Sequence, residues 1–234
     1  MITIKDLSKS YDGQKMAVDH INLDIRDGDI FGFVGLNGAG KSTTIKCLVG
    51  ILEFNEGEIL INGRSIKASP MECKKDLAYI SDNPEIYAYM RGIDYVKFIL
   101  SVYNRPYDND RVVALAREFE IDDVLGNLVS SYSHGMKQKL VLMAAFLHEP
   151  KLLVLDEPFV GLDPKATHML KTMMKDYAAK GNTIFFSTHV LEVAEKLCNK
   201  VAIIKNGRIV VSGTMEEITQ SSSLEEFFLE VNNE

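Results

Sequence analysis

Short apolar segments separated by polar residues and glycines recur along the chain, and this pattern predicts a series of β-strands. The predicted strands are Ile2–Leu7, Ile21–Ile25, Ile30–Val34, Glu58–Ile61, Leu77–Ile80, Leu152–Leu155, Thr183–Ser187, Val201–Ile204 and Ile209–Val211. The pair Asn206-Gly207 separates the last two segments. It predicts a hairpin turn there, because both residue types adopt positive φ readily.

Helical periodicity dominates the stretch between the strands that end at residue 80 and begin at residue 152. Its clearest pieces are Tyr95–Tyr103, Arg111–Phe119 and Lys137–Leu147. Near the end of the chain, SSLEEFFLEVNN predicts a short amphipathic helix that starts at a serine cap and serves packing. Strands and helices alternate on both sides of the middle stretch. The pattern therefore predicts an α/β core with a helical subdomain inserted into it.

Composition narrows the class of protein. With 234 residues, 46% of them apolar, the chain can bury a substantial core. The net charge of -7 argues against a general nucleic-acid binder, so no nucleic-acid partner is expected. The three cysteines, Cys47, Cys73 and Cys198, have no metal-binding spacing and predict reduced thiols in the cytosol. The N-terminal residues show no secretion signal, and no apolar run approaches the roughly 18 residues that a membrane span requires.

A glycine-rich loop carries the clearest chemistry. The segment IFGFVGLNGAGKSTTIKCLVGIL leads from an apolar strand through Gly35-x4-Gly40-Lys41-Ser42 into a helix. Glycines let the backbone curl around a phosphate, and the helix N-terminus attracts its charge. Lys41 can reach the β- and γ-phosphates, and the hydroxyl of Ser42 can ligate Mg²⁺. The predicted ATP contacts here are Gly35, Leu36, Asn37, Gly38, Ala39, Gly40, Lys41, Ser42 and Thr43.

Two other strand ends carry polar residues. LLVLDEP places Asp156 and Glu157 after a buried strand, where α/β sheets bind ligands. Asp156 is suited to the water shell of Mg²⁺ and Glu157 to activating a water molecule, although paired carboxylates also occur in solvated turns. IFFSTHV ends at His189, which either contacts the γ-phosphate or is structural. Tyr11 either stacks on adenine or is a surface tyrosine in a turn.

The segment SSYSHGMKQKL precedes an apolar helix. Ser133 fits an ordinary helix cap, whose hydroxyl accepts a hydrogen bond from the first turn. The same serine, with Gly135 and the free N–H groups of the helix start, also fits an anion-binding site. The local sequence leaves both interpretations open.

Together these motifs resemble the ATP-binding subunit of an ABC transporter, over nearly the whole chain. The order is Tyr11, the phosphate loop (35–42), the signature (132–136), the Walker B strand (152–157), the GLDP D-loop (161–164) and His189. The resemblance implies a P-loop NTPase core of mainly parallel sheet with an N-terminal antiparallel β portion. It implies one domain, 1–234, with core 1–82 and 150–213, helical subdomain 83–149 and a helical tail 214–234.

By this resemblance the chain is an ATPase that requires ATP and Mg²⁺. Glu157, His189 and Lys41 are its expected catalytic residues, and Asp163 is expected to communicate across a dimer. Ser133 and Gly135 are expected to bind, in trans, the ATP held by a second subunit. A partner permease would hold this pair of ATPase subunits at the cytoplasmic face of the cell membrane. The transported substrate lies outside what the chain encodes, since the permease provides its binding surface.

The chain departs from the family pattern at two places. The signature Leu-Ser-Gly-Gly-Gln has His134 and Met136 in place of its first glycine and its glutamine. This form resembles bacterial exporter-type subunits with separately encoded permeases, which favours export. Asp82 occupies the place of a glutamine that touches Mg²⁺, so Asp82 is a candidate magnesium ligand. The following aromatic and aliphatic patch, 84–90, predicts either ordinary packing or a groove for a permease helix.

Two other functions compete with transport. A non-transport ABC ATPase acting on ribosomes or DNA usually contains two ATPase units or a long coiled-coil insertion, and this acidic chain shows neither pattern. A small-molecule phosphotransferase would need a binding site for its acceptor substrate in place of the signature, the D-loop and His189.

Overall fold

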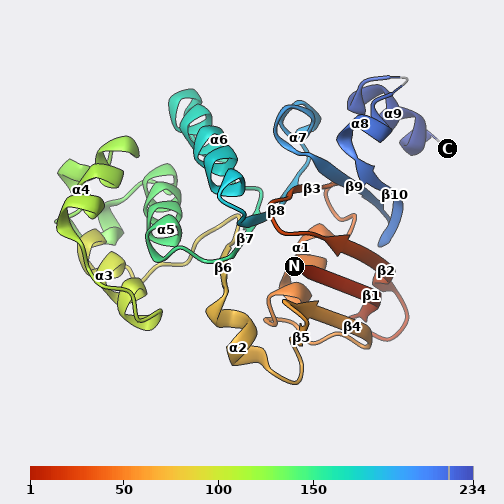
Figure 1. The fold of residues 1–234 in the computed structure, drawn as a ribbon, viewed down its shortest axis with the longest axis horizontal. Helices are drawn as coiled ribbons and strands as arrows, with labels where there is room; N and C mark the ends of the chain where they lie inside the picture. The colour runs from red at the N-terminus through yellow and green to blue at the C-terminus, as the bar shows by residue number, and fades with distance from the viewer. Residues whose placement is uncertain (221, 234) are drawn as a thin grey trace.

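The computed structural model describes residues 1–220 and 222–233 and contains two sheets (Figure 1). The larger sheet has the order β10-β9-β3-β8-β7-β6, and all its neighbouring pairs are parallel except β10–β9. Its strands are β3 (Ile30–Val34), β6 (Leu77–Ile80), β7 (Leu152–Asp156), β8 (Thr183–Thr188), β9 (Lys200–Lys205) and β10 (Arg208–Thr214). Every residue of β3, β7 and β8 is buried, which explains why these strands are mainly apolar and carry polar residues only at their ends. The carboxyl ends of the parallel strands meet at one edge.

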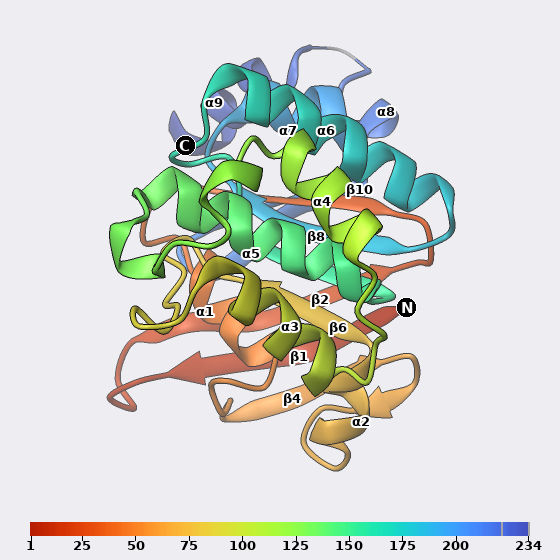
Figure 2. The ribbon, with the colours of Figure 1, turned by 90° about the vertical axis from the view of Figure 1, so that its left-hand side faces the viewer.

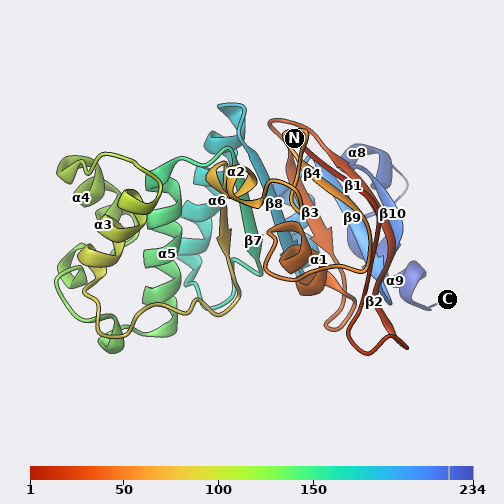
Figure 3. The ribbon, with the colours of Figure 1, turned by 90° about the horizontal axis from the view of Figure 1, so that it is seen from below.

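The smaller sheet is antiparallel and has the order β2-β1-β4-β5. Its strands are β1 (Ile2–Ser10), β2 (Met16–Ile25), β4 (Glu56–Ile61) and β5 (Arg64–Ser65). The helix α1 (Lys41–Leu48) shares one hydrophobic cluster with this sheet and with β3 and β8 of the larger sheet (Figure 3). Within that cluster the Phe31 and Phe185 rings stack with centroids 5.6 Å apart. This confirms the expected mainly parallel core with an N-terminal antiparallel portion.

The antiparallel strands are longer than predicted. β1 continues from Leu7 to Ser10, and β2 begins at Met16, before the predicted Ile21. The extension of β1 is polar, and the left-handed backbone of Asp6 and His20 interrupts the alternation of buried and exposed positions in the two strands. The hairpin prediction is confirmed. Asn206 and Gly207 have φ of 51° and 82° between the antiparallel strands β9 and β10.

Three helices form the middle of the chain: α3 (Gly92–Val102), α4 (Asn109–Glu118) and α5 (His134–His148). They lie at the end of the molecule away from the antiparallel sheet (Figures 1 and 2). Short 3-10 turns at Asp122–Val124 and Val129–Ser131 connect α4 to α5. The α5 helix starts three residues earlier than predicted, because its first turn is polar and only the later turns are buried in the core.

The remaining helices are α2 (Pro70–Lys75), α6 (Pro164–Ala179), α7 (Leu191–Leu197), α8 (Met215–Ile218) and α9 (Leu224–Asn233). Only α9 was among the predicted elements. The hydroxyl of Ser223 accepts a hydrogen bond from the Glu226 N–H at 3.2 Å, which confirms the serine cap. Leu224 and Phe228 are buried, and the Leu224 N–H donates to Glu195 at 3.0 Å, so α9 packs against α7. None of the helices in 1–220 and 222–233 combines the length and apolar character needed to cross a membrane.

The cysteines are unpaired and buried, as the thiol prediction requires. Burial raises the pKa of Cys47 to about 11 and also raises the pKa of Cys73 and Cys198. These thiols are therefore protonated and shielded from solvent near neutral pH.

Candidate functional site

The carboxyl edge of the parallel sheet gathers most of the predicted site residues. The phosphate loop follows β3, Asp82 follows β6, Glu157 follows β7 and His189 follows β8. One cavity of about 240 Å³ joins three of these positions. Its lining consists of Ala17, Leu36, Asn37, Gly38, Gly40, Lys41, Ser42, Thr43, Asp82 and Glu157.

The phosphate loop depends on glycine. Gly38 and Gly40 have φ of 81° and 111°, in the left-handed region. A Cβ on Gly40 would lie 2.6 Å from the Ala17 carbonyl oxygen, so no other residue fits the present backbone. Gly40 precedes α1, and no side chain caps this helix start. The first N–H groups of α1 are therefore available to an anion in the cavity.

Lys41 is held inside this edge, with 6% of its side chain exposed. Its ammonium donates to the carbonyl oxygens of Gly35 at 2.7 Å and Leu36 at 3.3 Å. The same nitrogen lies 3.4 Å from Glu157 Oε1. The Lys41 charge is thus placed beside the loop and next to the candidate catalytic carboxylate.

Glu157 lies between Lys41 and His189. Its side chain is 15% exposed, and its Oε2 lies 3.0 Å from His189 Nδ1. The backbone of Glu157 has φ of 49°, a conformation that costs energy for a residue with a Cβ. Asp156 immediately before it is almost fully buried at the end of β7. The structure therefore brings together Lys41, Glu157 and His189, which the sequence predicted separately.

Tyr11 lies on the other side of the phosphate loop. It lines a neighbouring cavity of about 390 Å³ together with Gly38 and Gly207. The Tyr11 hydroxyl is 3.2 Å from the Thr43 hydroxyl, while 65% of the residue remains exposed. The ring is therefore tethered at one end and accessible to a flat aromatic ligand.

The signature residues do not line the phosphate-loop cavity. Ser133 caps α5 by accepting a hydrogen bond from the Met136 N–H at 3.2 Å, so the ordinary helix-cap interpretation is correct within one chain. Gly135 packs against the D-loop, where an added Cβ would lie 2.7 Å from the Gly161 carbonyl oxygen. The signature segment and the D-loop are thus in direct contact in the same chain.

An ion pair ties α5 to the start of α6. Lys139 Nζ lies 3.0 Å from Asp163 Oδ2, and Asp163 also caps α6 by accepting from the Ala166 N–H at 2.8 Å. The hydrogen bond from Ala166, followed by that from Lys139, lowers the pKa of Asp163, so the carboxylate stays charged. Sequence patterns carry no signal for Lys139, since its role depends on a contact between helices that are distant in the chain.

Asp82 lines the phosphate-loop cavity, as expected for a residue near bound metal. Its Oδ1 accepts a hydrogen bond from the Asn83 N–H at 2.9 Å, and its other oxygen makes no hydrogen bond or ion pair with the described residues. Two residues of the adjoining patch are strongly exposed, Tyr87 at 68% and Tyr89 at 91%. The Tyr87 ring contacts Phe98 of α3 edge to face. Ordinary core packing therefore does not account for these two tyrosines.

The oxygen groups at this edge fit Mg²⁺. Ser42 and Asp82 line the cavity, and the Asp156 carboxylate lies beside it at the end of β7. Hydroxyl and carboxylate oxygens suit a hard divalent cation. Within 1–220 and 222–233, no three side chains of the acidic, histidine or cysteine type form a metal cage. A few protein oxygens combined with phosphate oxygens are the usual arrangement for Mg²⁺ in nucleotide sites.

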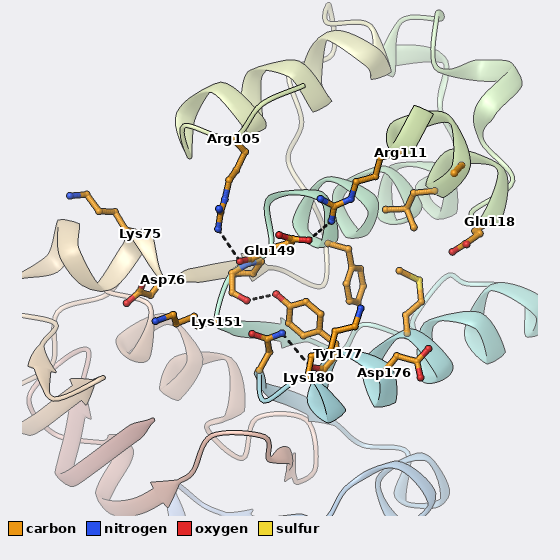
Figure 4. A pocket seen from close by; sticks show the side chains of 16 residues that line it. Lys75, Asp76, Arg105, Arg111, Glu118, Glu149, Lys151, Asp176, Tyr177 and Lys180 are labelled. Atoms are coloured by element: carbon orange, nitrogen blue, oxygen red, sulfur yellow. Dashed lines mark hydrogen bonds and ion pairs between the residues drawn. The ribbon is translucent and has the colours of Figure 1, made fainter. Parts of the chain in front are cut away.

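A larger cavity, of about 660 Å³, lies at the opposite edge of the sheet (Figure 4). Arg105 donates there to the carbonyl oxygens of His148 and Glu149 at 2.9 and 3.3 Å. Arg111 pairs with the Glu149 carboxylate at 2.7 Å. These contacts join α3 and α4 to the end of α5. The lining contains basic and acidic side chains in nearly equal number, so the cavity favours neither an anionic nor a cationic ligand.

The fold is that of a phosphate-loop NTPase, and comparisons with known proteins agree. Residues 18–160 match the family model described as ABC transporter. The ABC-type transporter ATP-binding protein EcsA of Bacillus subtilis is 31% identical over 241 residues, covering 100% of this chain and 97% of the relative. The bacitracin transport ATP-binding protein BcrA of Bacillus licheniformis is 35% identical and aligns over 90% of this chain and 68% of the relative.

Solved structures show the same relationship. A structure described as the ATP-binding subunit of an ABC transporter has a TM-score of 0.92 at 34% identity and covers 99% of both chains. A dimeric ATP-binding cassette with bound ADP and phosphate has a TM-score of 0.80 at 19% identity, over 92% of this chain and 99% of that one, and shares its fold. The chain belongs to the ABC transporter family of ATP-binding proteins.

Proposed function

We propose that this chain is the ATP-hydrolysing motor subunit of an ABC transporter. Two subunits close around ATP, and a separately encoded membrane permease converts the closure into transport, in the direction of export. The observation that carries the proposal is the cavity in which the phosphate loop, Asp82 and Glu157 meet, with His189 bound to Glu157. The subunit would lie at the cytoplasmic face of the membrane through its permease.

The geometry supports the following roles for the residues of the site. The N–H groups of the loop and the α1 N-terminus bind the phosphates, and Lys41 compensates their charge. Ser42, with Asp156 and Asp82, would hold Mg²⁺, which neutralises charge on the phosphates. Glu157 accepts the proton of the attacking water, and its hydrogen bond with His189 orients the carboxylate. The buried position of Lys41 keeps these charges close in a site of low polarity.

Two measurements test this proposal. The purified chain should release phosphate from ATP only when Mg²⁺ is present. A tagged copy should also copurify with an integral membrane protein. Hydrolysis together with ribosome or DNA association and no membrane partner would contradict the transport assignment and favour a non-transport ABC ATPase. Absence of hydrolysis with the membrane partner present would contradict the motor assignment.

Tyr11 is expected to stack on the adenine ring. Aromatic stacking on a base contributes about 1–3 kcal/mol in other nucleic-acid sites, so Tyr11→Ala should weaken ATP binding about tenfold or more. Tyr11→Phe keeps the ring and removes only the hydrogen bond to Thr43, so its affinity should change little. Fluorescence titration with mant-ATP measures all three affinities. Equal affinities would place Tyr11 outside the site.

The exposed tyrosines are expected to bind the permease. Changing Tyr87 and Tyr89 to serine should leave ATP hydrolysis by the isolated subunit unchanged and reduce copurification with the membrane partner. The matched control changes two other exposed apolar residues, Val210 and Leu229, which lie in β10 and α9. Normal permease binding by the tyrosine variant, or equal loss in the control, would contradict the assignment of this patch.

A further inference from the structure

Ser187 contacts both acidic residues at the carboxyl end of β7, Asp156 in the strand and Glu157 directly after it. It is fully buried in β8, directly opposite Asp156 in the parallel pairing of β7 and β8. From this position its hydroxyl donates a hydrogen bond to Asp156 Oδ1. It also accepts a hydrogen bond from the Glu157 N–H at 3.0 Å. One hydroxyl group therefore links the carboxylate of one acid to the backbone of the next.

Both hydrogen bonds of Ser187 satisfy polar groups that would otherwise have no hydrogen-bond partner. The Asp156 carboxylate is buried, and within the described residues Ser187 supplies the only side-chain hydrogen bond to it. Glu157 turns out of the strand with positive φ, which removes its N–H from the regular pairing of the sheet. A buried carboxylate or N–H without a partner is costly, so the Ser187 hydroxyl stabilises this backbone and fixes the orientation of Asp156.

The same strand also controls the Glu157 side chain. His189 follows Ser187 by two residues, and its Nδ1 lies 3.0 Å from Glu157 Oε2. The end of β8 thus holds Glu157 at two points, its N–H through Ser187 and its carboxylate through His189. Because Ser187 also holds Asp156, it aligns the two acids with each other.

We propose that Ser187 is a positioning residue that fixes Asp156 for the metal and Glu157 for the attacking water. This inference rests on the proposed ATPase function. Partners of metal-site carboxylates commonly alter metal affinity or activity by about 10–100-fold when they are removed. Ser187→Ala should therefore lower kcat about tenfold or more and leave the KM for ATP nearly unchanged, since Ser187 does not line the phosphate-loop cavity.

A merely structural role would predict a different result, and Ser8→Ala is the matched control. Ser8 is also fully buried, and its hydroxyl accepts one hydrogen bond, from the His20 N–H at 3.1 Å, within the antiparallel sheet. Both variants remove a buried hydroxyl of equal size, but Ser187→Ala loses two hydrogen bonds and Ser8→Ala loses one, so Ser187→Ala should lose more stability. Only Ser187→Ala should affect the metal and kcat.

The experiment compares wild type, Ser187→Ala and Ser8→Ala in two measurements. The first is phosphate release against ATP and Mg²⁺ concentration. The second needs no turnover: Mn²⁺ binding in the presence of ADP, followed by the loss of the free-ion EPR signal. Ser187→Ala should bind Mn²⁺ about tenfold more weakly than wild type, and Ser8→Ala should match wild type.

The outcomes separate this inference from the proposed function. If wild type hydrolyses ATP and Ser187→Ala retains wild-type kcat and Mn²⁺ affinity, the positioning role is wrong. Equal losses in the two variants would also overturn it, because a general loss of stability would explain them. If wild type itself does not hydrolyse ATP, the proposed ATPase function fails, whatever the variants show.

Discussion

Glu157→Gln is expected to lower ATP turnover by about 10²–10⁴-fold, the usual contribution of a general base. Glutamine keeps the size of the side chain but cannot accept the proton of the attacking water at neutral pH. The phosphate loop and Lys41 are unchanged, so ATP binding should persist. Phosphate release at saturating MgATP measures the turnover, and mant-ATP fluorescence measures the affinity.

Glu149→Gln is the matched control for this prediction. Glu149 has φ of 54°, close to the 49° of Glu157, and lies at the opposite edge of the sheet beside Arg111. Glu149 therefore has the same left-handed backbone conformation as Glu157 but does not line the phosphate-loop cavity. Its replacement should leave turnover near the wild-type value. Turnover of Glu157→Gln within a few-fold of wild type would remove Glu157 from the role of base.

Ser133→Arg is expected to abolish the association of two subunits around ATP. Ser133 begins α5 and does not line the cavity of its own phosphate loop. In the proposed function, the helix start at Ser133 would bind the ATP of a second chain, and pairing about a two-fold axis would create two identical sites. The bulk of arginine at the γ-phosphate should block closure while each subunit keeps its ATP. Sedimentation of Glu157→Gln with and without the added Ser133→Arg measures the association.

Loss of the helix cap alone must be separated from this effect, since Ser133 accepts a hydrogen bond from Met136. Asp108→Ala removes the comparable cap of α4, where the Asp108 side chain accepts from Asp110 and Arg111. Added to Glu157→Gln, it should cost about 0.5–2 kcal/mol of stability and leave ATP-dependent association intact. If Asp108→Ala blocks association as strongly as Ser133→Arg, the signature has no special part in it.

The phosphate loop could be predicted from sequence because its function depends on backbone shape. Gly38 and Gly40 occupy conformations that favour glycine, and the spacing to Lys41 fixes the lysine beside the loop. The positions of the buried strands along the chain were also accessible, since uninterrupted apolar runs such as Leu152–Leu155 indicate strands buried on both faces. These features are encoded within short segments of the chain.

Ser187 could not be predicted in the same way. In the sequence it is one of three hydroxyl residues at the ends of an otherwise apolar strand, and its importance follows from the pairing of β8 with β7, which places it opposite Asp156. The ion pair between Lys139 and Asp163 likewise requires α5 to lie against the start of α6. Such contacts arise from the tertiary arrangement, so local patterns carry no signal for them.

Light scattering of the Glu157→Gln variant tests the central claim, that ATP closes two subunits into one motor. One chain has a mass of 26.2 kDa. With MgATP the variant should show twice that mass, and without nucleotide or with MgADP it should show the mass of one chain. A variant that binds ATP at saturation and still scatters as a single chain would contradict the account.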